Sequence, residues 1–331
     1  MSEGRQPAAP PADPVVVVGG PTASGKSALA LAIAEAFGGT VINGDSMQVY
    51  RDLEIVTARP RGDELARAPH RLYGFLGVGE RCSAGRWRDL ATAEIGAVAA
   101  GGRLPVVVGG TGLYLRALMG GLHDLPEVPA DIRAALNARV ATEGVRTLHA
   151  ELAARDPETA GRLSPGDSQR VVRALEILIH TGRGIASWQA EAAAEQAQKM
   201  AVGSACGFRF LNIRLAPPRD VLYAACDARF ARMLEEGAEA EVARFLERPG
   251  AAASPLAKAV GVAPIRAFLE GEIDRARMFE LGMRDTRRYA KRQTTWFSHQ
   301  FVSNLIIETK LSEINEGRIF SFIRNFLLTE G

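Results

Sequence analysis

A glycine-rich stretch near the start of the chain has the residue types and the spacing needed to bind a polyphosphate. Gly20 is followed by four residues and then by Gly25, Lys26 and Ser27, just after a run of four valines. Glycines let backbone N–H groups turn toward phosphate oxygens, a lysine neutralises their charge, and a serine hydroxyl can bind Mg²⁺. The sequence therefore predicts a P-loop that binds a diphosphate or a triphosphate. Its residues are Gly20, Pro21, Thr22, Ala23, Ser24, Gly25, Lys26 and Ser27.

Two further polar residues follow apolar runs, where a parallel sheet would place its ligands. Asp45 comes after Thr40–Asn43, and Thr111 comes after Leu104–Gly110. Ligands of parallel sheets gather at the carboxyl ends of the strands. Spacing alone leaves three roles for Asp45, namely a general base, a support for Mg²⁺ and a helix cap. It leaves two roles for Thr111, whose hydroxyl could face an anion or cap the next helix.

The elements that must position these residues indicate a parallel α/β sheet interrupted by a helical segment. From Val15 to about Gly121, strand-like apolar runs alternate with helical stretches. From about Leu122 to Ala205, the sequence has helical periods and no strand-like runs. Phe208–Leu215 alternates with a period of two, which predicts a strand that returns to the sheet. We therefore expect a P-loop NTPase-like α/β core from 14–121 and 206–331, an all-helical insertion over 122–205, and a disordered tail over 1–13. Within the core we further expect helices near Arg219–Glu236 and Ile273–Ser298, a strand over Phe301–Ile307 and a last helix near Ile314–Leu328.

Composition and charge exclude several classes of protein. The 331 residues carry a net charge of only +2, so a nucleic acid would have to be held by local arginine clusters. The cysteines Cys82, Cys206 and Cys226 lie far apart, without the spacing of a zinc site or of a disulfide framework. The chain has no apolar run of about 18 residues and no signal-peptide pattern at its start. We expect a cytoplasmic protein that does not enter a membrane.

Two segments could bind nucleic acid, and each has an ordinary structural alternative. Asp167 or Ser168 would cap a predicted helix on which Gln169 and Arg173 share a face. These two side chains could read a base and bind phosphate, or they could belong to a solvated face. Arg287–Phe297 interleaves basic with aromatic residues, as nucleic-acid surfaces do, but its aromatic residues could equally lie in the core.

Taken together, these segments resemble the tRNA dimethylallyltransferase family of bacteria from about Val15 to Phe297. The matching segments are Gly20–Ser27, Gly44–Tyr50, Ala68–Leu72, Gly109–Tyr114, Asp167–Ile177 and Tyr289–Phe297. A generic P-loop kinase would share the first of them and neither of the last two. The resemblance implies transfer of a dimethylallyl group from dimethylallyl diphosphate to N6 of adenine-37 in tRNAs that read codons beginning with U. The P-loop would then hold a diphosphate, with Mg²⁺, instead of ATP.

The same resemblance implies roles for individual residues. Asp45 would accept a proton from the adenine amine, Thr111 would position the reacting groups, and Arg229 would contact the diphosphate. Contacts to tRNA would fall on Asp45, Ser46, Met47, Gln48, Thr111, Arg133, Gln169, Arg170, Val171, Val172 and Arg173. The expected partners are the anticodon stem-loop of a tRNA and dimethylallyl diphosphate, with a monomeric protein that needs no stable protein partner.

The sequence also departs from the family pattern. Val56 stands where the family usually has a glycine, Arg59 where it has a lysine, and Val262 where it has a tyrosine. With Val56 and Arg59, the sequence does not fix whether this segment has the backbone freedom and the point charge that the family pattern provides there. Other activities also fit parts of the pattern, namely an adenylate isopentenyltransferase acting on free AMP, ADP or ATP and a small-molecule kinase that binds ATP. A tRNA-binding module without activity would not need Lys26, Ser27 and Asp45 together.

Overall fold

The computed structural model describes residues 12–120, 125–191, 207–309 and 316–329. The chain divides into two compact units, which we call the core unit (1–119 with 207–331) and the helical unit (120–206). Most of the tail expected over 1–13 lies outside the described residues, and the first strand already begins at Asp13. Cys206 also lies outside the described residues.

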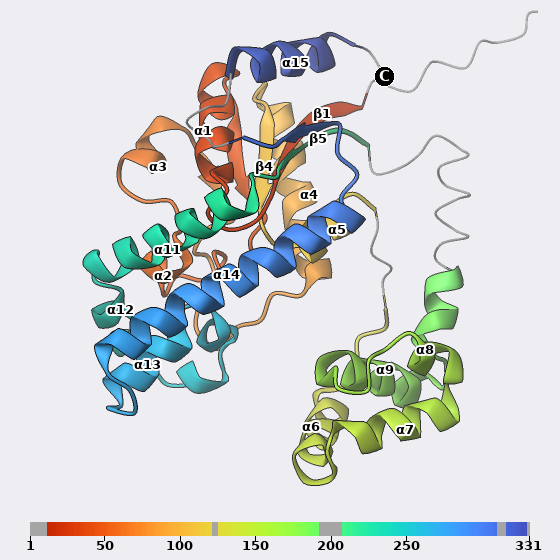
Figure 1. The fold of residues 1–331 in the computed structure, drawn as a ribbon. Helices are drawn as coiled ribbons and strands as arrows, with labels where there is room; N and C mark the ends of the chain where they lie inside the picture. The colour runs from red at the N-terminus through yellow and green to blue at the C-terminus, as the bar shows by residue number, and fades with distance from the viewer. Residues whose placement is uncertain (1–11, 121–124, 192–206, 310–315, 330–331) are drawn as a thin grey trace, which may run out of the picture. The chain divides into compact units, whose positions relative to one another are not determined.

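Six parallel strands form the sheet of the core unit, which confirms the expected α/β class (Figure 1). Their order across the sheet is β3-β2-β4-β1-β5-β6. The strands are β1 (Asp13–Gly19), β2 (Thr40–Asn43), β3 (His70–Arg71), β4 (Pro105–Gly109), β5 (Phe208–Leu215) and β6 (Leu305–Ile307). Because each of these pairings is parallel, the carboxyl ends of β1, β2 and β4 meet at one edge.

Valine-rich runs form the centre of the sheet because both of its faces are covered. All four residues of Val15–Val18 in β1 are completely buried, as are Val106 and Val107 in β4. β-Branched side chains suit such strands, and burying one of them is worth roughly 1.5–3 kcal/mol. β1 lies between β4 and β5, with Val18 opposite Val108 and Ile213. The P-loop therefore leaves the centre of the sheet.

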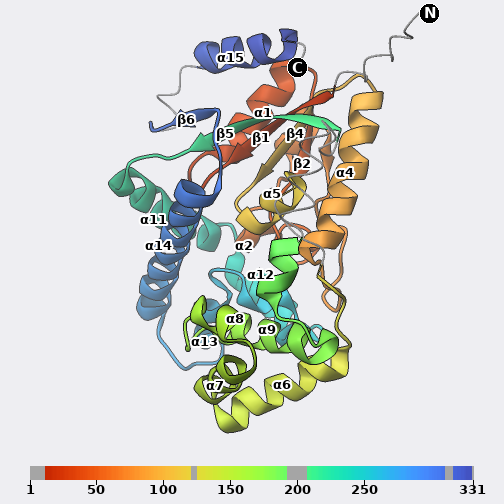
Figure 2. The same ribbon diagram turned by 90° about the vertical axis from the view of Figure 1, so that its right-hand side faces the viewer.

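Helices cover both faces of the sheet (Figure 2). On one face, α1 (Lys26–Ala36) and α15 (Glu316–Leu328) share an apolar cluster with alternate residues of the strands. On the other, α4 (Ala84–Ala100) packs against β2, β4 and α5 (Gly112–Leu118). The remaining helices of the core unit are α2 (Glu54–Thr57), α3 (Asp63–Arg67), α11 (Arg219–Glu235), α12 (Ala238–Leu246), α13 (Val262–Leu269) and α14 (Arg275–Gln300), with 3-10 turns at Ala251–Ala253 and Pro255–Lys258.

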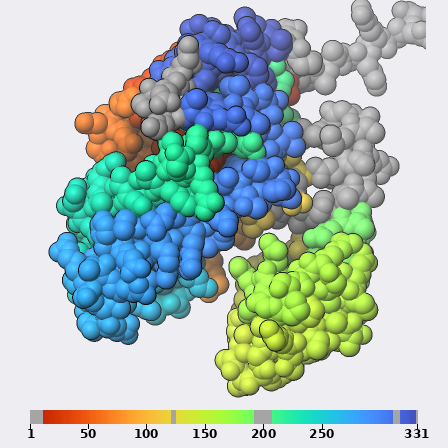
Figure 3. All heavy atoms as spheres, in the orientation of Figure 1, coloured from red at the N-terminus to blue at the C-terminus, as the bar shows by residue number. Residues whose placement is uncertain are grey.

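The long helix α14 lies beside α11 in the core unit (Figure 3). Its buried residues recur every three or four positions, which makes one stripe along the helix. They are Met278, Gly282, Thr286, Ala290, Gln293 and Phe297. Lys291 and Arg292, in contrast, are exposed. The segment Arg287–Phe297 therefore has its Phe297 in the core, while several of its basic side chains face solvent.

The described residues of the helical unit form helices and no strands. The helices are α6 (Ala130–Glu143), α7 (Val145–Arg155), α8 (Pro157–Gly161) and α9 (Ser168–Thr181), and the described residues 185–191 are helical as well. Asp167 caps α9, as one of the two expected alternatives had it, because its Oδ1 accepts a hydrogen bond from Arg170 N at 3.2 Å. Leu148, Leu152 and Leu175 are fully buried at the centre of the unit.

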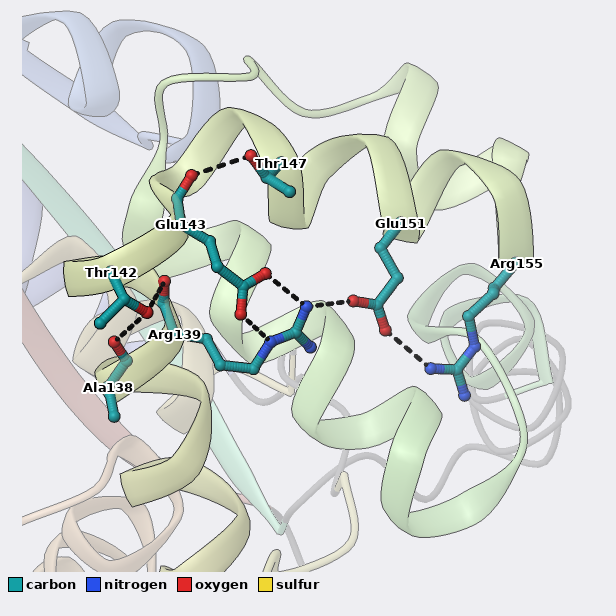
Figure 4. Close-up of polar contacts among 7 residues, drawn as sticks. All are labelled: Ala138, Arg139, Thr142, Glu143, Thr147, Glu151 and Arg155. Atoms are coloured by element: carbon teal, nitrogen blue, oxygen red, sulfur yellow. Dashed lines mark hydrogen bonds and ion pairs between the residues drawn. The ribbon is translucent and has the colours of Figure 1, made fainter.

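Several arginines of the helical unit are paired with carboxylates (Figure 4). Arg139 of α6 bonds Glu143 of the same helix and Glu151 of α7, each at 2.8 Å, and Glu151 also pairs with Arg155 at 3.1 Å. Exposed ion pairs of this kind add little stability. They do neutralise positive charge that would otherwise attract a polyanion.

One expectation for the end of the chain needs correction. Of the segment Phe301–Ile307, only Leu305–Ile307 forms a strand, in parallel pairing with β5. The helix expected near Ile314–Leu328 is confirmed over its described residues as α15 (Glu316–Leu328), and Ile314 lies outside the described residues. Within the described part of the chain, no helix combines the length and the apolar character that crossing a bilayer requires.

Candidate active site

The P-loop connects β1 to α1 and has the form of an anion-binding turn. Ala23 and Gly25 both have a positive φ, 61° and 89°, a conformation that turns successive backbone N–H groups toward one concavity. The amino end of α1, which begins at Lys26, adds a partial positive charge. Ser24 is buried, and within the described residues its hydroxyl oxygen has no hydrogen-bond partner. An unpartnered buried hydroxyl in such a turn is suited to a ligand oxygen.

Three charged groups from separate elements influence one another beside the P-loop. Burial, and then the charge of Arg229 on α11, lower the pKa of Lys26 to about 8, while the carboxylate of Asp45 opposes this shift. Burial also lowers the pKa of Arg229, and Asp45 again opposes it. Lys26 Nζ donates to Pro21 O at 3.3 Å. The structure thus brings together the three residues expected to carry charge in the site.

The backbone around Asp45 is held by the last residue of β2. Asn43 is completely buried, and its Oδ1 accepts a hydrogen bond from Asp45 N at 2.8 Å. Its Nδ2 donates to Asp45 O and to Leu72 O, both at 3.0 Å. Asp45 Oδ1 accepts from Met47 N at 2.9 Å, so one carboxylate oxygen caps the local turn. This turn aims the carboxylate without using its second oxygen.

Thr111 joins the loop after β4 to the loop after β2. Its Oγ1 accepts a hydrogen bond from Ser46 N at 2.9 Å and donates to Ser46 Oγ at 3.1 Å. Thr111 also stands at the N-cap position of α5, as the helix-cap alternative had it, but its side chain makes no capping hydrogen bond to that helix. The two loops touch closely, since a Cβ on Gly109 would lie only 2.0 Å from Gly44 O. Only glycine fits at position 109, and this contact brings Thr111 to Asp45.

Three residues that position the site are absent from the sequence-based expectations. Asn43 is one, and a polar residue at the end of a strand beside Asp45 was a usable signal. Glu241 of α12 accepts hydrogen bonds from Ile55 N and Val56 N at 2.8 and 2.9 Å. Gln293 of α14 bonds backbone groups of two loops, as detailed below. Glu241 and Gln293 act on partners about 180 residues away or more, and no local pattern marks such contacts.

The residues that depart from the family pattern, Val56, Arg59 and Val262, all make contacts within the core unit. Arg59 Nη1 donates to Tyr50 O at 2.9 Å and to Arg51 O at 3.0 Å. Its guanidinium also pairs with Glu54 at 3.4 Å. The charge at position 59 is therefore used in holding local backbone together. Val56 and Val262 are both buried.

The residues expected to contact tRNA occur in both units. In the core unit, Ser46, Met47 and Gln48 are half-buried, and Gln48 Nε2 donates to Thr57 O and Ala58 O, both at 2.9 Å. Arg229 Nη2 reaches the same Thr57 O at 3.5 Å. This part of the loop is therefore fixed to the short helix α2, whose amino end Glu241 caps.

In the helical unit, the expected contact residues of α9 point in different directions. Gln169 and Arg170 are exposed, whereas Val171 and Val172 are buried in the unit's core. The side chains of the two valines therefore face away from solvent. Any contact between these valines and tRNA would have to involve the backbone.

The buried carboxylate of Glu176 bonds the other two arginines expected to contact tRNA, Arg133 and Arg173. Glu176 is only 2% exposed and bonds Arg133 at 2.6 and 3.0 Å and Arg173 at 3.0 Å. Burial would raise the pKa of Glu176, but the hydrogen bonds from the two arginines outweigh it and hold the pKa below its usual value. The cluster has two cations and one anion, so it keeps one positive charge at the surface.

The lowered pKa of Lys26 predicts a pH dependence for anion binding. In the free protein Lys26 is a cation below pH 8 and loses its proton above it, whereas a bound diphosphate would stabilise the cation and raise its pKa. The affinity for pyrophosphate should therefore be insensitive to Lys26 below pH 8 and fall by up to about tenfold per pH unit above it. Calorimetric titrations from about pH 6 to 10 measure this.

The matched control for that titration is Lys26→Arg. Arginine keeps its charge throughout the range, and the ionisation of pyrophosphate itself cancels in the ratio of the two proteins. Parallel profiles for the two proteins across the alkaline range would contradict the prediction.

Two protein families match the segments of this chain that contain the residues of the site. Residues 48–300 match the IPP transferase family, and residues 14–75 match the isopentenyl transferase family. The chain is 51% identical to a tRNA dimethylallyltransferase of Rhodospirillum centenum, over 89% of this chain and 91% of the relative. It is 50% identical to one of Rhodopseudomonas palustris, over 90% and 88% of the two chains.

Solved structures resemble the whole fold. A tRNA isopentenylpyrophosphate transferase of Bacillus halodurans matches with a TM-score of 0.65 and 33% identity, covering 95% of both chains. A eukaryotic dimethylallyltransferase described as acting on tRNA matches with a TM-score of 0.78 and 26% identity, covering 95% of this chain and 79% of the other.

Proposed function

We infer that this chain, which belongs to the tRNA dimethylallyltransferase family, is a prenyltransferase that moves a dimethylallyl group from dimethylallyl diphosphate to N6 of an adenine in tRNA. By the same family membership, the adenine is the one at position 37, next to the anticodon of tRNAs that read codons beginning with U. The observation that carries the proposal is the meeting of Lys26, Arg229 and Asp45 beside the P-loop. The two cations can stabilise the negative charge of a leaving diphosphate, and the carboxylate can accept the proton that an amine loses.

The proposed chemistry assigns one step to each group. The adenine N6 attacks C1 of the dimethylallyl group, a C–N bond forms, and the C–O bond to the diphosphate breaks. The P-loop amides, Lys26 and Arg229 stabilise the charge that develops on the departing oxygen. Asp45 takes the proton that N6 loses. Thr111, bonded to Ser46, keeps the loop of Asp45 against the end of β4.

Mg²⁺ fits this arrangement as a partner of the diphosphate. Within the described residues, no cluster of three or more His, Cys, Asp and Glu side chains could hold a metal by itself. Mg²⁺ commonly keeps several waters and binds through substrate phosphates with only one or two protein groups. The exposed Ser27, at the start of α1, is the residue we propose to hold it. When bound, the ion would neutralise charge on the leaving diphosphate.

One assay separates the proposed function from its alternatives. The protein is incubated with Mg²⁺, dimethylallyl diphosphate and either unmodified tRNA or AMP, and prenylated adenine is followed. We expect product on tRNA alone. Product on AMP would select an adenylate isopentenyltransferase, and phosphate transfer from ATP without prenylation would select a kinase. RNA binding without any product would select a binding module.

The proposal also predicts which arginine of α9 contributes to tRNA binding. The side chain of Arg170 is 74% exposed, with Asp167 3.5 Å away. We expect Arg170→Ala to weaken tRNA binding and to reduce the slope of log affinity against log salt by roughly 0.7–0.9. Filter binding at several salt concentrations measures both effects.

Arg139→Ala is the control for that substitution. Arg139 lies in the same unit, but its charge is already matched by Glu143 and Glu151 (Figure 4). It should leave the salt slope near that of the unchanged protein. Equal slopes for both variants would argue against a phosphate contact by Arg170.

A further inference from the structure

Gln293 connects the P-loop, which would hold the leaving diphosphate, to the loop after β4, which adjoins the loop of Asp45. It lies on α14 and is only 6% exposed. Its Oε1 accepts a hydrogen bond from Thr22 N of the P-loop at 2.8 Å, and its Nε2 donates to Gly110 O at 2.8 Å. A Cβ on Gly110 would lie 2.3 Å from Gln293 Nε2, so the glycine leaves room for the amide. Both loops are thus tied to one planar group.

The connection continues from Gly110 to the carboxylate. Thr111 follows Gly110 in the chain, and its Oγ1 holds both the backbone N–H and the hydroxyl of Ser46. Ser46 is the neighbour of Asp45. A continuous set of hydrogen bonds and peptide bonds therefore runs from Thr22 in the P-loop, through Gln293, to Asp45.

We propose that Gln293 is a positioning residue that fixes the separation between the P-loop diphosphate and the Asp45 base. The inference rests on the proposed function. An amide is suited to this task because it accepts on one side and donates on the other, and both its partners here are backbone groups. A misplacement of about 1 Å between reacting groups can cost roughly 10²-fold in rate. Gln293 would act on the rate of transfer more than on donor binding.

The first test compares Gln293→Met with Thr286→Val. Methionine fills a similar volume without either hydrogen bond. Thr286 is a buried residue of the same helix whose hydroxyl donates to Gly282 O of that helix, at 2.8 Å. We expect Gln293→Met to lower kcat by roughly 10–100-fold while the Kd for pyrophosphate changes by less than about threefold. An unchanged kcat, or the same loss in Thr286→Val, would overturn the proposal.

The second test uses Gln293→Glu and does not depend on the methionine variant folding. A protonated glutamic acid can donate to Gly110 O and accept from Thr22 N as glutamine does. An ionised carboxylate cannot donate, so one of its oxygens would face the acceptor Gly110 O without a hydrogen between them. The ratio of its kcat to that of the unchanged enzyme should therefore rise toward one as the pH falls. Taking the ratio removes the pH effects that the two enzymes share. A ratio that does not vary with pH would assign Gln293 to packing alone.

A third measurement needs neither tRNA nor donor, so it separates this inference from the proposed function. In Gln293→Met, peptides covering both 20–24 and 109–115 should exchange their amide hydrogens faster than in the unchanged protein. Faster exchange confined to α14 would overturn the positioning role. An unchanged protein that prenylates no tRNA would refute the proposed function, while the exchange result would still decide the role of Gln293.

Discussion

Replacing Asp45 by Asn should lower the rate of prenyl transfer by roughly 10²–10⁴-fold, because the amide cannot accept the proton that the adenine amine loses. Donor binding should change much less, since the diphosphate is held by the P-loop, Lys26 and Arg229. Single-turnover measurements with tRNA give the rate, and titration with pyrophosphate gives the binding. Asparagine keeps an oxygen that can accept from Met47 N, as Asp45 Oδ1 does at 2.9 Å, so the turn should survive.

Asp45→Ala serves as the comparison. It removes the base and the turn acceptor together, and we expect it to be at least as slow as Asp45→Asn. If the asparagine variant were active and the alanine variant inactive, the carboxylate would be required only as a cap. Loss of pyrophosphate binding with an unchanged transfer rate would instead assign Asp45 to holding the donor.

Lys26→Met should weaken pyrophosphate binding by roughly 10²-fold or more, because it removes a half-buried charge that would pair with the ligand. It should also stabilise the ligand-free protein. Burial depresses the pKa of Lys26 in the folded state from 10.5 to about 8, so at neutral pH the fold carries a charge that it disfavours. We expect Tm to rise by roughly 2 °C or more.

The stability gain has a predictable pH window. The folded-state pKa lies below the unfolded value, so the penalty is complete below pH 8 and disappears as the pH rises toward 10.5. The gain in Tm of Lys26→Met should shrink over that range. Lys258→Met removes the same charge from an exposed position and should alter neither binding nor Tm. An equal change in both variants would show that the effect comes from net charge.

The parts of this fold that were predictable from sequence depend on local signals. Valine runs mark β1 and β4 because strands covered on both faces need apolar side chains throughout. Glycines and Lys26 mark the P-loop because phosphate binding needs close backbone approach. Asp45 and Thr111 were found as candidates because they follow strands whose carboxyl ends must meet. Asp167 was found because α9 needs an acceptor at its first turn.

The residues that escaped prediction act over long distances in the chain. Gln293 bonds the backbone of Thr22, 271 positions away, and Glu241 caps α2 from 186 positions away. Gln293 lies in the segment Tyr289–Phe297 that carries part of the family resemblance, but nothing local distinguishes it from the other polar residues there, and the same is true of Glu241 on α12. Their importance arises only when the strands bring the loops together. Arg59 is a further case, because the sequence left the role of its charge open, whereas the carbonyl groups around its guanidinium give it a structural role.

The pairing of β1 with β5 has a consequence for how this protein is made. Asp13 pairs with Phe208, so the two strands are 195 positions apart (208 − 13), and the whole helical unit is synthesised between them. At roughly 5–20 residues per second, a ribosome leaves the Val15–Val18 strand without this neighbour for about 10–40 s. During that interval an uncharged, β-branched segment is open to contact with other nascent chains. Cells that produce this enzyme should therefore need a chaperone at the ribosome exit to obtain it in good yield.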